Sequence, residues 1–297
     1  MEDKTQLADF QAEVLPQLET HMGKHLATLN SAPKLQKAMS YSIEAGGKRI
    51  RPLMILLICQ ARGRVLDDDV LSVAGSLEFM HTYSLIHDDL PEMDNDDLRR
   101  GKPTNHKVFG QDIAVLAGDA LLTEAIGWLA ETNLAPELQV KLIKNLSQAS
   151  GANGMVAGQT GDILGEQKTL TLTELMDVHR KKTGMLLEYA CVAGGLLVNA
   201  DEQQSENLRS FGQNFGLAFQ IYDDILDVVS TTEKMGKKVH KDLAENKNTF
   251  PRLLGIDQAY EALNETLEQA RKNLAQLAKT GFDVTLLAQL LGYFEVK

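Results

Sequence analysis

Apolar residues recur at three- and four-residue spacing along almost the whole chain of 297 residues, and this periodicity restricts its fold most. Leu7, Phe10, Val14 and Leu18 show the pattern near the start. Such spacing places apolar side chains on one face of an α-helix. No segment shows the apolar–polar alternation of a half-buried strand. The sequence therefore predicts an all-α fold, and without a linker or low-complexity segment we expect one domain over residues 1–297.

Composition narrows the function classes. With 43% hydrophobic residues the chain is able to bury a substantial core. A formal net charge of −11 argues against nucleic-acid binding and against a basic membrane-surface patch. Cys59 and Cys191 lie in apolar surroundings, so we expect buried thiols and no disulfide. The polar start is unlike a signal peptide, and no apolar run reaches the roughly eighteen residues that span a bilayer, so we expect a soluble cytoplasmic protein.

Residues 88–97 hold six carboxylates, and two arginines follow at once. Like charges at this density repel one another, so they need a positive partner. Asp88, Asp89 and Asp94 offer the hard oxygen ligands that bind Mg²⁺ together with substrate phosphate. For this stretch taken alone, a solvated acidic loop is the competing interpretation.

A second acidic cluster, DDILD at residues 223–227, interrupts an otherwise apolar segment that we expect to be one helix over 202–229. Asp223 and Asp227 are one turn apart and share a face, and Gln220 lies three residues earlier on the same side. Burying three acids in an apolar helix is costly unless they have partners. A metal site is therefore favoured here, and it makes a metal site likelier at the first cluster too.

Basic residues accompany both clusters. The GGKRIRP motif at residues 46–52 places Lys48 and Arg51 at a glycine-rich junction before a helix. Cationic side chains and free backbone donors at such a junction suit a diphosphate, although solvated basic residues are common there too. His81 lies seven residues before the first aspartate, on the same helix face.

Further basic residues lie around the second cluster. In the HRKKTG motif, Gly184 predicts a kink in a long helix that aims Lys182 and Thr183 inward. A basic, glycine-containing loop with Lys237, and Lys247 shortly after it, follows the DDILD motif. An exposed basic helix face is the alternative interpretation of the HRKKTG motif.

In this order, the motifs resemble those of the trans-isoprenyl diphosphate synthase family, most closely its bacterial farnesyl diphosphate synthases, over nearly the whole chain. The resemblance rests on GGKRIRP, on DDLPEMD with the RRG after it, on KTG, and on Gln220 with DDILD. It implies an isoprenoid-synthase-type helical bundle around a central active-site cavity, usually as a homodimer. It also implies Mg²⁺ as the cofactor, with three ions per active site.

The same resemblance implies a role for each site residue. The implied metal ligands are Asp88, Asp89, Asp94, Asp223, Asp224 and Asp227. The residues implied to bind isopentenyl diphosphate are Lys48, Arg51, His81 and Arg100. The residues implied to bind the allylic substrate are Arg99, Lys182, Thr183, Gln220, Lys237 and Lys247, of which the catalytic ones are Arg99, Lys182, Thr183 and Gln220.

The implied reaction is head-to-tail prenyl transfer by ionisation, condensation and elimination. The allylic substrate loses diphosphate, the double bond of isopentenyl diphosphate attacks the resulting cation at C1, and a proton then leaves for the departed diphosphate. Dimethylallyl diphosphate gives geranyl diphosphate and then mainly (E,E)-farnesyl diphosphate.

Product length is implied to depend on Tyr83, five residues before Asp88 and so about 7.5 Å away along a helix. Helical side chains lean toward the N-terminus, so the ring is placed to close the cavity floor. Simple core packing is the alternative role. His240 and Asn246 depart from the glycines usual in the family, close to Lys237 and Lys247.

Four other functions fit less well. A class I terpene cyclase has no need of Lys48 and Arg51 and generally replaces the second aspartate motif. A longer-chain, geranylgeranyl synthase is opposed chiefly by Tyr83. A non-catalytic subunit of the same fold tends to lose metal-binding aspartates, and all are present here. A cation-binding scaffold has no need of basic residues beside each acidic cluster.

Overall fold

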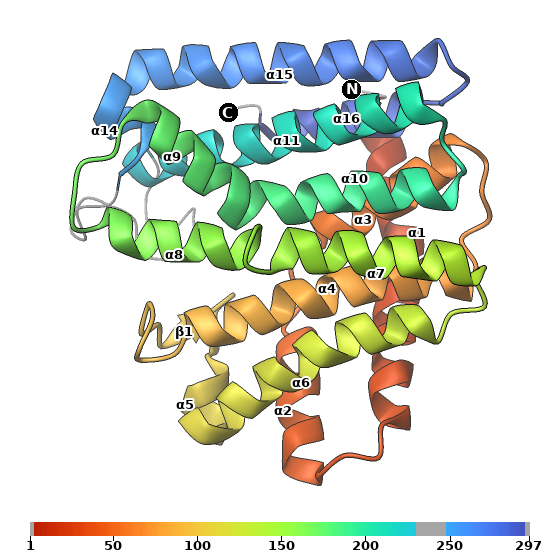
Figure 1. The fold of residues 1–297 in the computed structure, drawn as a ribbon, viewed down its shortest axis with the longest axis vertical. Helices are drawn as coiled ribbons and strands as arrows, with labels where there is room; N and C mark the ends of the chain where they lie inside the picture. The colour runs from red at the N-terminus through yellow and green to blue at the C-terminus, as the bar shows by residue number, and fades with distance from the viewer. Residues whose placement is uncertain (1–2, 230–247, 295–297) are drawn as a thin grey trace. The chain divides into compact units, whose positions relative to one another are not determined.

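The structure, a computed structural model, describes residues 3–229 and 248–294, which are almost entirely helical (Figure 1). The predicted all-α class is confirmed. The elements up to residue 150 are α1 (Asp3–Thr28), α2 (Pro33–Ile43), α3 (Ile50–Ala61), α4 (Asp68–Asp88), β1 (Leu98–Arg99), β2 (Lys102–Pro103), α5 (Asn105–Phe109), α6 (Gln111–Ala130) and α7 (Pro136–Ser150). Those after it are α8 (Met155–Gly165), α9 (Leu172–His179), η1 (Arg180–Gly184), α10 (Met185–Leu197), α11 (Glu202–Val229), α14 (Phe250–Leu254), α15 (Ile256–Ala278), α16 (Thr285–Leu290) and η2 (Leu291–Phe294).

These elements gather into two compact units, and each is described by itself. The first unit comprises Ala8–Leu56 and Leu66–Ile143. The second comprises Met1–Leu7, Leu57–Val65 and Lys144–Lys297. That the whole chain acts as one domain stays a prediction.

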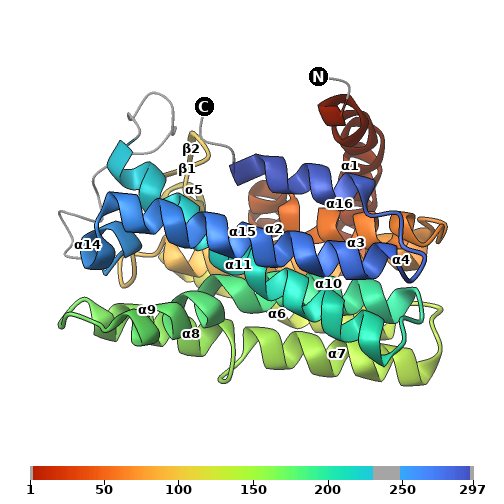
Figure 2. The ribbon, with the colours of Figure 1, turned by 90° about the horizontal axis from the view of Figure 1, so that it is seen from above.

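Helix α4 is the central element of the first unit. It begins after Asp67, whose carboxylate caps the helix by accepting a hydrogen bond from the amide of Val70. The helix lies alongside α6 (Figures 1 and 2). Phe79 of α4 stacks on Trp128 of α6 with 5.1 Å between ring centroids. This packing fixes the position of the C-terminal end of α4, where the first aspartate cluster begins.

A buried ion pair anchors the junction of residues 46–52 in the same unit. The Arg49 side chain is 1% exposed and its Nη1 lies 2.6 Å from Oε1 of Glu78, itself 2% exposed. Arg49 also donates to the carbonyl of Ile43 at 2.5 Å. Breaking a buried ion pair costs about 3–5 kcal/mol because the remaining charge is left without a partner. The backbone that carries the neighbouring basic residues is therefore held from inside the unit.

A short hairpin follows the first aspartate cluster, which the sequence analysis did not predict. Its strands β1 and β2 pair antiparallel, with Arg99 opposite Lys102. The turn residues Arg100 and Gly101 have φ values of 55° and 75°, as a tight hairpin turn with two left-handed positions requires. Strands of two residues are too short for any alternation to show in the sequence.

In the second unit, α11 runs between α10 and α15 as part of one layer of long helices (Figures 1 and 2). Its bounds, Glu202–Val229, are those the sequence predicts. Phe211 and Phe215 are fully buried, and Phe215 meets Phe294 edge to face at 5.0 Å. The aromatic core of this unit thus lies beside the stretch that carries the second aspartate cluster.

The kink predicted at Gly184 is a π-turn, η1, inserted between α9 and α10. A Cβ atom on Gly158 of α8 would lie 2.1 Å from the amide nitrogen of Lys182, and one on Gly216 of α11 would lie 2.7 Å from Cα of Gly184. Only glycine permits approaches this close. The backbones of α8 and α11 therefore pack directly against the π-turn on two sides. This contact supports a packing role for Gly158.

Helix α6 is long and apolar enough to cross a membrane by length and composition alone, contrary to the expectation that no segment is. Of the relevant window, 39% is buried in the structure, and a core helix of a soluble protein meets the same criterion. Val115 and Leu116 on α6 are 40% and 51% exposed. A cytoplasmic location stays a prediction.

Candidate active site

The first aspartate cluster begins where α4 ends. Asp88 is the last residue of the helix, and the chain then turns so that the amide of Asp94 donates to the carbonyl of Asp88 at 2.9 Å. The backbone of Asp94 therefore returns to the end of the helix. Both side chains belong to partly exposed residues. Their carboxylates lie at the surface of the first unit, where a cation has access to them.

Asp89 has a different environment from its neighbour. Its side chain is 4% exposed, and Arg99 of the hairpin donates to it from Nε at 2.8 Å and from Nη2 at 2.5 Å. Burial raises the pKa of the Asp89 carboxyl, while the hydrogen bonds from Arg99 act in the opposite direction. Bidentate pairs of this kind fix geometry as well as charge. Asp89 thus positions Arg99, one of the predicted substrate-binding arginines.

Arg51 and His81, predicted to bind the same substrate, meet in the first unit. Arg51 Nη1 lies 3.2 Å from Nε2 of His81. Burial, and next the charge of Arg51, hold the pKa of His81 well below its usual value. A neutral imidazole accepts the hydrogen bond from the guanidinium, whereas a protonated one would repel it.

Arg100 joins the hairpin to the junction of residues 46–52. Its guanidinium donates to the carbonyl of Gly46 and lies against Gly47, where a Cβ atom would be 2.5 Å from Arg100 Cζ. Gly47 has a φ of 132°, so both its backbone and its lack of a side chain suit this contact. Lys48 next to it is exposed. The predicted isopentenyl diphosphate residues therefore come together within one unit.

In the second unit, Asp224 is the centre of a hydrogen-bonded chain. Thr183 Oγ1 donates to Oε1 of Gln220 at 3.0 Å, and Gln220 Nε2 donates to Oδ1 of Asp224 at 3.0 Å. The other Asp224 oxygen accepts from the amide of Phe250 at 3.0 Å and lies 3.4 Å from Nε2 of His179. Gln220 thus bonds to Asp224, four residues on, which lies on the same side of α11 as Asp223 relative to Gln220. These hydrogen bonds fix the orientation of the Gln220 amide group.

Asp223 precedes Asp224 in the sequence, and Asp227 follows it one helical turn after Asp223. Asp223 is partly exposed, and its charge, after burial, contributes to raising the pKa of Tyr293 to about 12. Asp227 is 6% exposed, and its Oδ2 is buried with no hydrogen-bond partner among the described residues. A buried carboxylate oxygen without a partner is costly, and a cation would satisfy it. The donor set of oxygens suits Mg²⁺.

Lys182 makes an ion pair that the sequence analysis missed. Its Nζ lies 2.5 Å from Oδ2 of Asp162 on α8, and both side chains are about one-quarter exposed. The signal for Asp162 was its place four residues after Gly158, on the helix face that touches the π-turn. His179, also missed, stands at the start of the HRKKTG motif itself.

Two predicted substrate residues, Lys237 and Lys247, lie outside the described residues, as do the departures at His240 and Asn246. Their roles stay predictions. The structure places the remaining site residues as two groups, one in each unit.

Tyr83 is buried one turn before the end of α4. Its ring meets that of His87 edge to face at 5.7 Å, and His87 Nε2 lies 3.0 Å from the carbonyl oxygen of Val115 on α6. Burial, and next the charge of Asp88, raise the pKa of Tyr83 to about 12. The ring is therefore packed against His87, and its role in setting product length stays a prediction.

Comparisons with known proteins identify the family of the chain. The polyprenyl synthetase family model matches residues 32–281. The farnesyl diphosphate synthase of Geobacillus stearothermophilus is 49% identical over 278 residues, covering 92% of this chain and 93% of that protein. The geranylgeranyl diphosphate synthase of Cyanophora paradoxa is 41% identical, covering 86% and 85%. The crystal structure of a Helicobacter pylori geranyltransferase, complexed with magnesium and isoprenyl diphosphate, matches with a TM-score of 0.86, 35% identity, and coverage of 96% and 97%.

Proposed function

The chain belongs to the polyprenyl synthetase family and is a prenyltransferase that makes farnesyl diphosphate, and we propose that its two aspartate clusters bind the metal ions that activate the allylic diphosphate. One observation carries the assignment of roles. In each cluster the second aspartate, Asp89 or Asp224, is buried and bonded within the protein, while the first, Asp88 or Asp223, is partly exposed. The first aspartates are therefore the ligands, and the second ones position other residues.

The family uses a divalent metal ion, and we assign three Mg²⁺ ions per active site to this chain. Asp88 and Asp94 would hold ions in the first unit, and Asp223 would hold another with support from Asp227, whose Oδ2 has no hydrogen-bond partner within residues 3–229 and 248–294. Bound Mg²⁺ would neutralise the charge that develops on the leaving diphosphate. Arg99 and Lys182 add positive charge at fixed positions because each is paired with a carboxylate.

Gln220 and Thr183 are placed to stabilise the allylic cation. The bond from Gln220 to Asp224 turns the amide nitrogen toward the buried aspartate, so the amide oxygen faces Thr183. Oxygen dipoles held in advance favour a developing positive charge more than mobile water does, because they need no reorganisation. Asp224 thereby sets the orientation of Gln220 without contacting the substrate itself.

Isopentenyl diphosphate would bind to Lys48, Arg51, His81 and Arg100 in the first unit. The C1–O bond of the allylic substrate breaks, and its electron pair leaves with diphosphate. The double bond of isopentenyl diphosphate then forms a bond to C1, which leaves a tertiary cation. A proton lost from the adjacent carbon restores a double bond and is taken up by the departed diphosphate.

One assay tests the function. The protein is incubated with isopentenyl diphosphate, Mg²⁺ and either dimethylallyl or geranyl diphosphate, and the products are separated by chain length. We expect farnesyl diphosphate as the main product from both primers, and none once EDTA has removed the metal ion. No product with any primer would contradict the proposal, while mainly geranylgeranyl diphosphate would favour the longer-chain activity of the Cyanophora paradoxa relative.

We also propose that the protein is a homodimer. Val108, Val115 and Leu116 are apolar residues at least 40% exposed along α5 and α6. Such a stripe favours burial against a second copy. Light scattering at micromolar concentration is expected to give twice the chain mass of 32.7 kDa. A mass of one chain would reject the dimer.

A further inference from the structure

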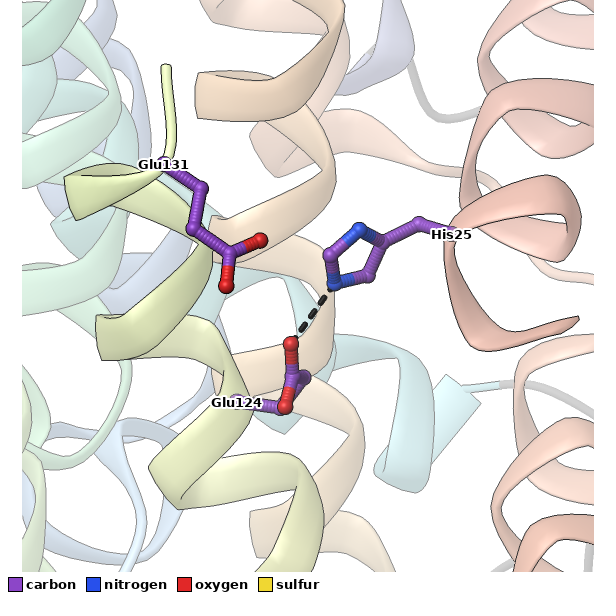
Figure 3. Close-up of side chains that lie close together, drawn as sticks. All are labelled: His25, Glu124 and Glu131. Atoms are coloured by element: carbon purple, nitrogen blue, oxygen red, sulfur yellow. Dashed lines mark hydrogen bonds and ion pairs between the residues drawn. The ribbon is translucent and has the colours of Figure 1, made fainter. Parts of the chain in front are cut away.

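Three candidate metal ligands meet in the first unit, away from the aspartate cluster of that unit. His25 comes from α1, and Glu124 and Glu131 come from α6 and its C-cap (Figure 3). One ligand atom from each residue lies within 4.8 Å of the other two. Figure 3 shows both carboxylates directed toward the imidazole ring. His25 Nε2 is 2.7 Å from Glu124 Oε1.

The spacing of residues on α6 builds this cluster. Glu124, Trp128 and Glu131 are separated by four and three positions, so they share one face of the helix. His25 stacks on the central Trp128 with 3.9 Å between ring centroids and 14° between planes. The imidazole is therefore held flat on the indole, with one carboxylate from the turn before and one from the turn after.

Burial makes the histidine the fixed member and Glu131 the adjustable one. The His25 side chain is 10% exposed and that of Glu124 is 22% exposed, whereas Glu131 is exposed. Phe79 of α4 covers another side of the imidazole, at 6.1 Å between ring centroids. A fixed ring with an exposed carboxylate at its edge gives an ion both a rigid ligand and a route from solvent.

We propose that His25, Glu124 and Glu131 bind a zinc-class divalent ion that joins α1 to α6. One imidazole nitrogen and two carboxylate oxygens are ligands that Zn²⁺ accepts, with water in the fourth position. Bond lengths of about 2.0–2.2 Å to Zn²⁺ place neighbouring donor atoms roughly 3.3 Å apart. Rotation of the exposed Glu131 side chain would adjust its separations, which lie within 4.8 Å, to that value, while the 2.7 Å between His25 Nε2 and Glu124 Oε1 would widen slightly to admit the ion.

The ligand chemistry separates this site from the proposed Mg²⁺ sites. Imidazole favours Zn²⁺, Cu²⁺ and Ni²⁺, whereas Mg²⁺ prefers all-oxygen sites and keeps several waters. Phe79 precedes Asp88 by nine residues on α4, about 13 Å along the helix axis. The ion would therefore serve as a cross-link between two helices and take no part in prenyl transfer.

Without an ion, a proton holds the same groups together. It lies between His25 Nε2 and Glu124 Oε1, and a metal ion that binds there must displace it. Binding should therefore weaken as the pH falls. The competing account is a permanent ion pair of His25 and Glu124, in which the proximity of Glu131 has no further consequence.

The test uses the tag-free full chain, stripped with a chelator and then held in millimolar Mg²⁺ to occupy the aspartate clusters. Cu²⁺ is added below one equivalent, and its paramagnetic resonance spectrum is recorded. We expect coupling to an imidazole nitrogen, which the oxygen-only clusters cannot give. Zn²⁺ at a hundred times its dissociation constant should raise the Tm by about 5 °C.

Variants locate the signal. His25→Asn should abolish the nitrogen coupling and weaken Zn²⁺ binding in calorimetry at least tenfold to about a hundredfold, and Glu131→Gln should weaken it without loss of the His25–Glu124 bond. His21→Asn is the matched control. His21 lies one turn earlier on α1 and stacks on the same Trp128 at 5.4 Å, but its Nε2 is 2.9 Å from the Ser72 hydroxyl. It should keep both signals.

Circular dichroism of each stripped variant verifies its fold independently of any metal ion. Absence of nitrogen coupling in the wild-type protein would overturn the proposal, as would coupling and Zn²⁺ affinity that persist in the His25→Asn variant. The same signal lost with His21→Asn and kept with His25→Asn would overturn it as well, since the ion would then lie elsewhere on α1.

Discussion

Replacing Asp88 with alanine is expected to lower kcat/KM for farnesyl diphosphate synthesis about a thousandfold. Asp88 ends α4 beside Asp94, and the variant would lose a ligand for the ion that neutralises the leaving diphosphate. Loss of one well-placed electrostatic contact in a transition state costs roughly 3–4 kcal/mol, which corresponds to this factor. Steady-state kinetics over a range of Mg²⁺ concentrations measures the change, and the variant should also need more Mg²⁺.

Two controls separate ligation from local charge. Asp97→Asn removes a carboxylate of the same acidic stretch, 74% exposed and paired with Lys107 at 2.6 Å, and should change kcat/KM less than about twofold. Asp89→Asn should mainly raise KM for the allylic substrate, because it releases Arg99. If Asp89→Asn and Asp88→Ala show the same loss and the same Mg²⁺ dependence, the assigned division between ligand and positioning aspartate is wrong.

Replacing Tyr83 with alanine is expected to shift the main product from farnesyl to geranylgeranyl diphosphate. The ring is 5% exposed and held against His87, so its removal leaves space at the place where the growing chain would end. A further isopentenyl unit then has room to add. Chromatography of the products, with geranyl and farnesyl diphosphate as primers, measures the shift. Loss of the buried ring also costs about 3–5 kcal/mol of stability, so Tm is measured alongside.

Tyr83→Phe is the matched variant for this experiment. It keeps the ring and removes only the hydroxyl, so the product should stay farnesyl diphosphate if ring volume sets the length. An unchanged product from Tyr83→Ala, in a protein whose Tm shows it is folded, would reduce Tyr83 to core packing.

Helical periodicity was sufficient to predict the fold class and several helices. The bounds of α11 agree with the predicted range 202–229, because apolar residues recur at helical spacing along the segment and continue past the DDILD cluster. Helix α4 begins at Asp68, since the Asp67 side chain supplies the cap. The motifs likewise contain most of the residues that the structure brings into contact in each unit, although their roles stay predictions.

Partners distant in sequence were beyond prediction. Nothing local distinguishes Asp88 from Asp89, and only the return of the hairpin shows that Arg99 takes the second carboxylate. Asp224 is a similar case, because its contact with the amide of Phe250 joins residues 26 positions apart. The buried pair of Arg49 and Glu78 was also missed, since a basic residue between two predicted substrate ligands reads as one more of them.

The π-turn at Arg180–Gly184 divides the long segment 172–197 into two helices, α9 and α10. The side chains of α10 therefore need not continue the helical faces of α9. Each residue advances an α-helix by about 100° of rotation about its axis. The number of residues in the π-turn therefore sets the direction in which the side chains of α10 point relative to those of α9. His179 at the end of α9 then meets Asp224, while Thr183 meets Gln220. Shortening the turn by one residue would leave the segment helical, but it would rotate Thr183 away from Gln220. The position of Thr183 thus depends on the number of residues in the turn, and deleting one of them would be more harmful there than many substitutions.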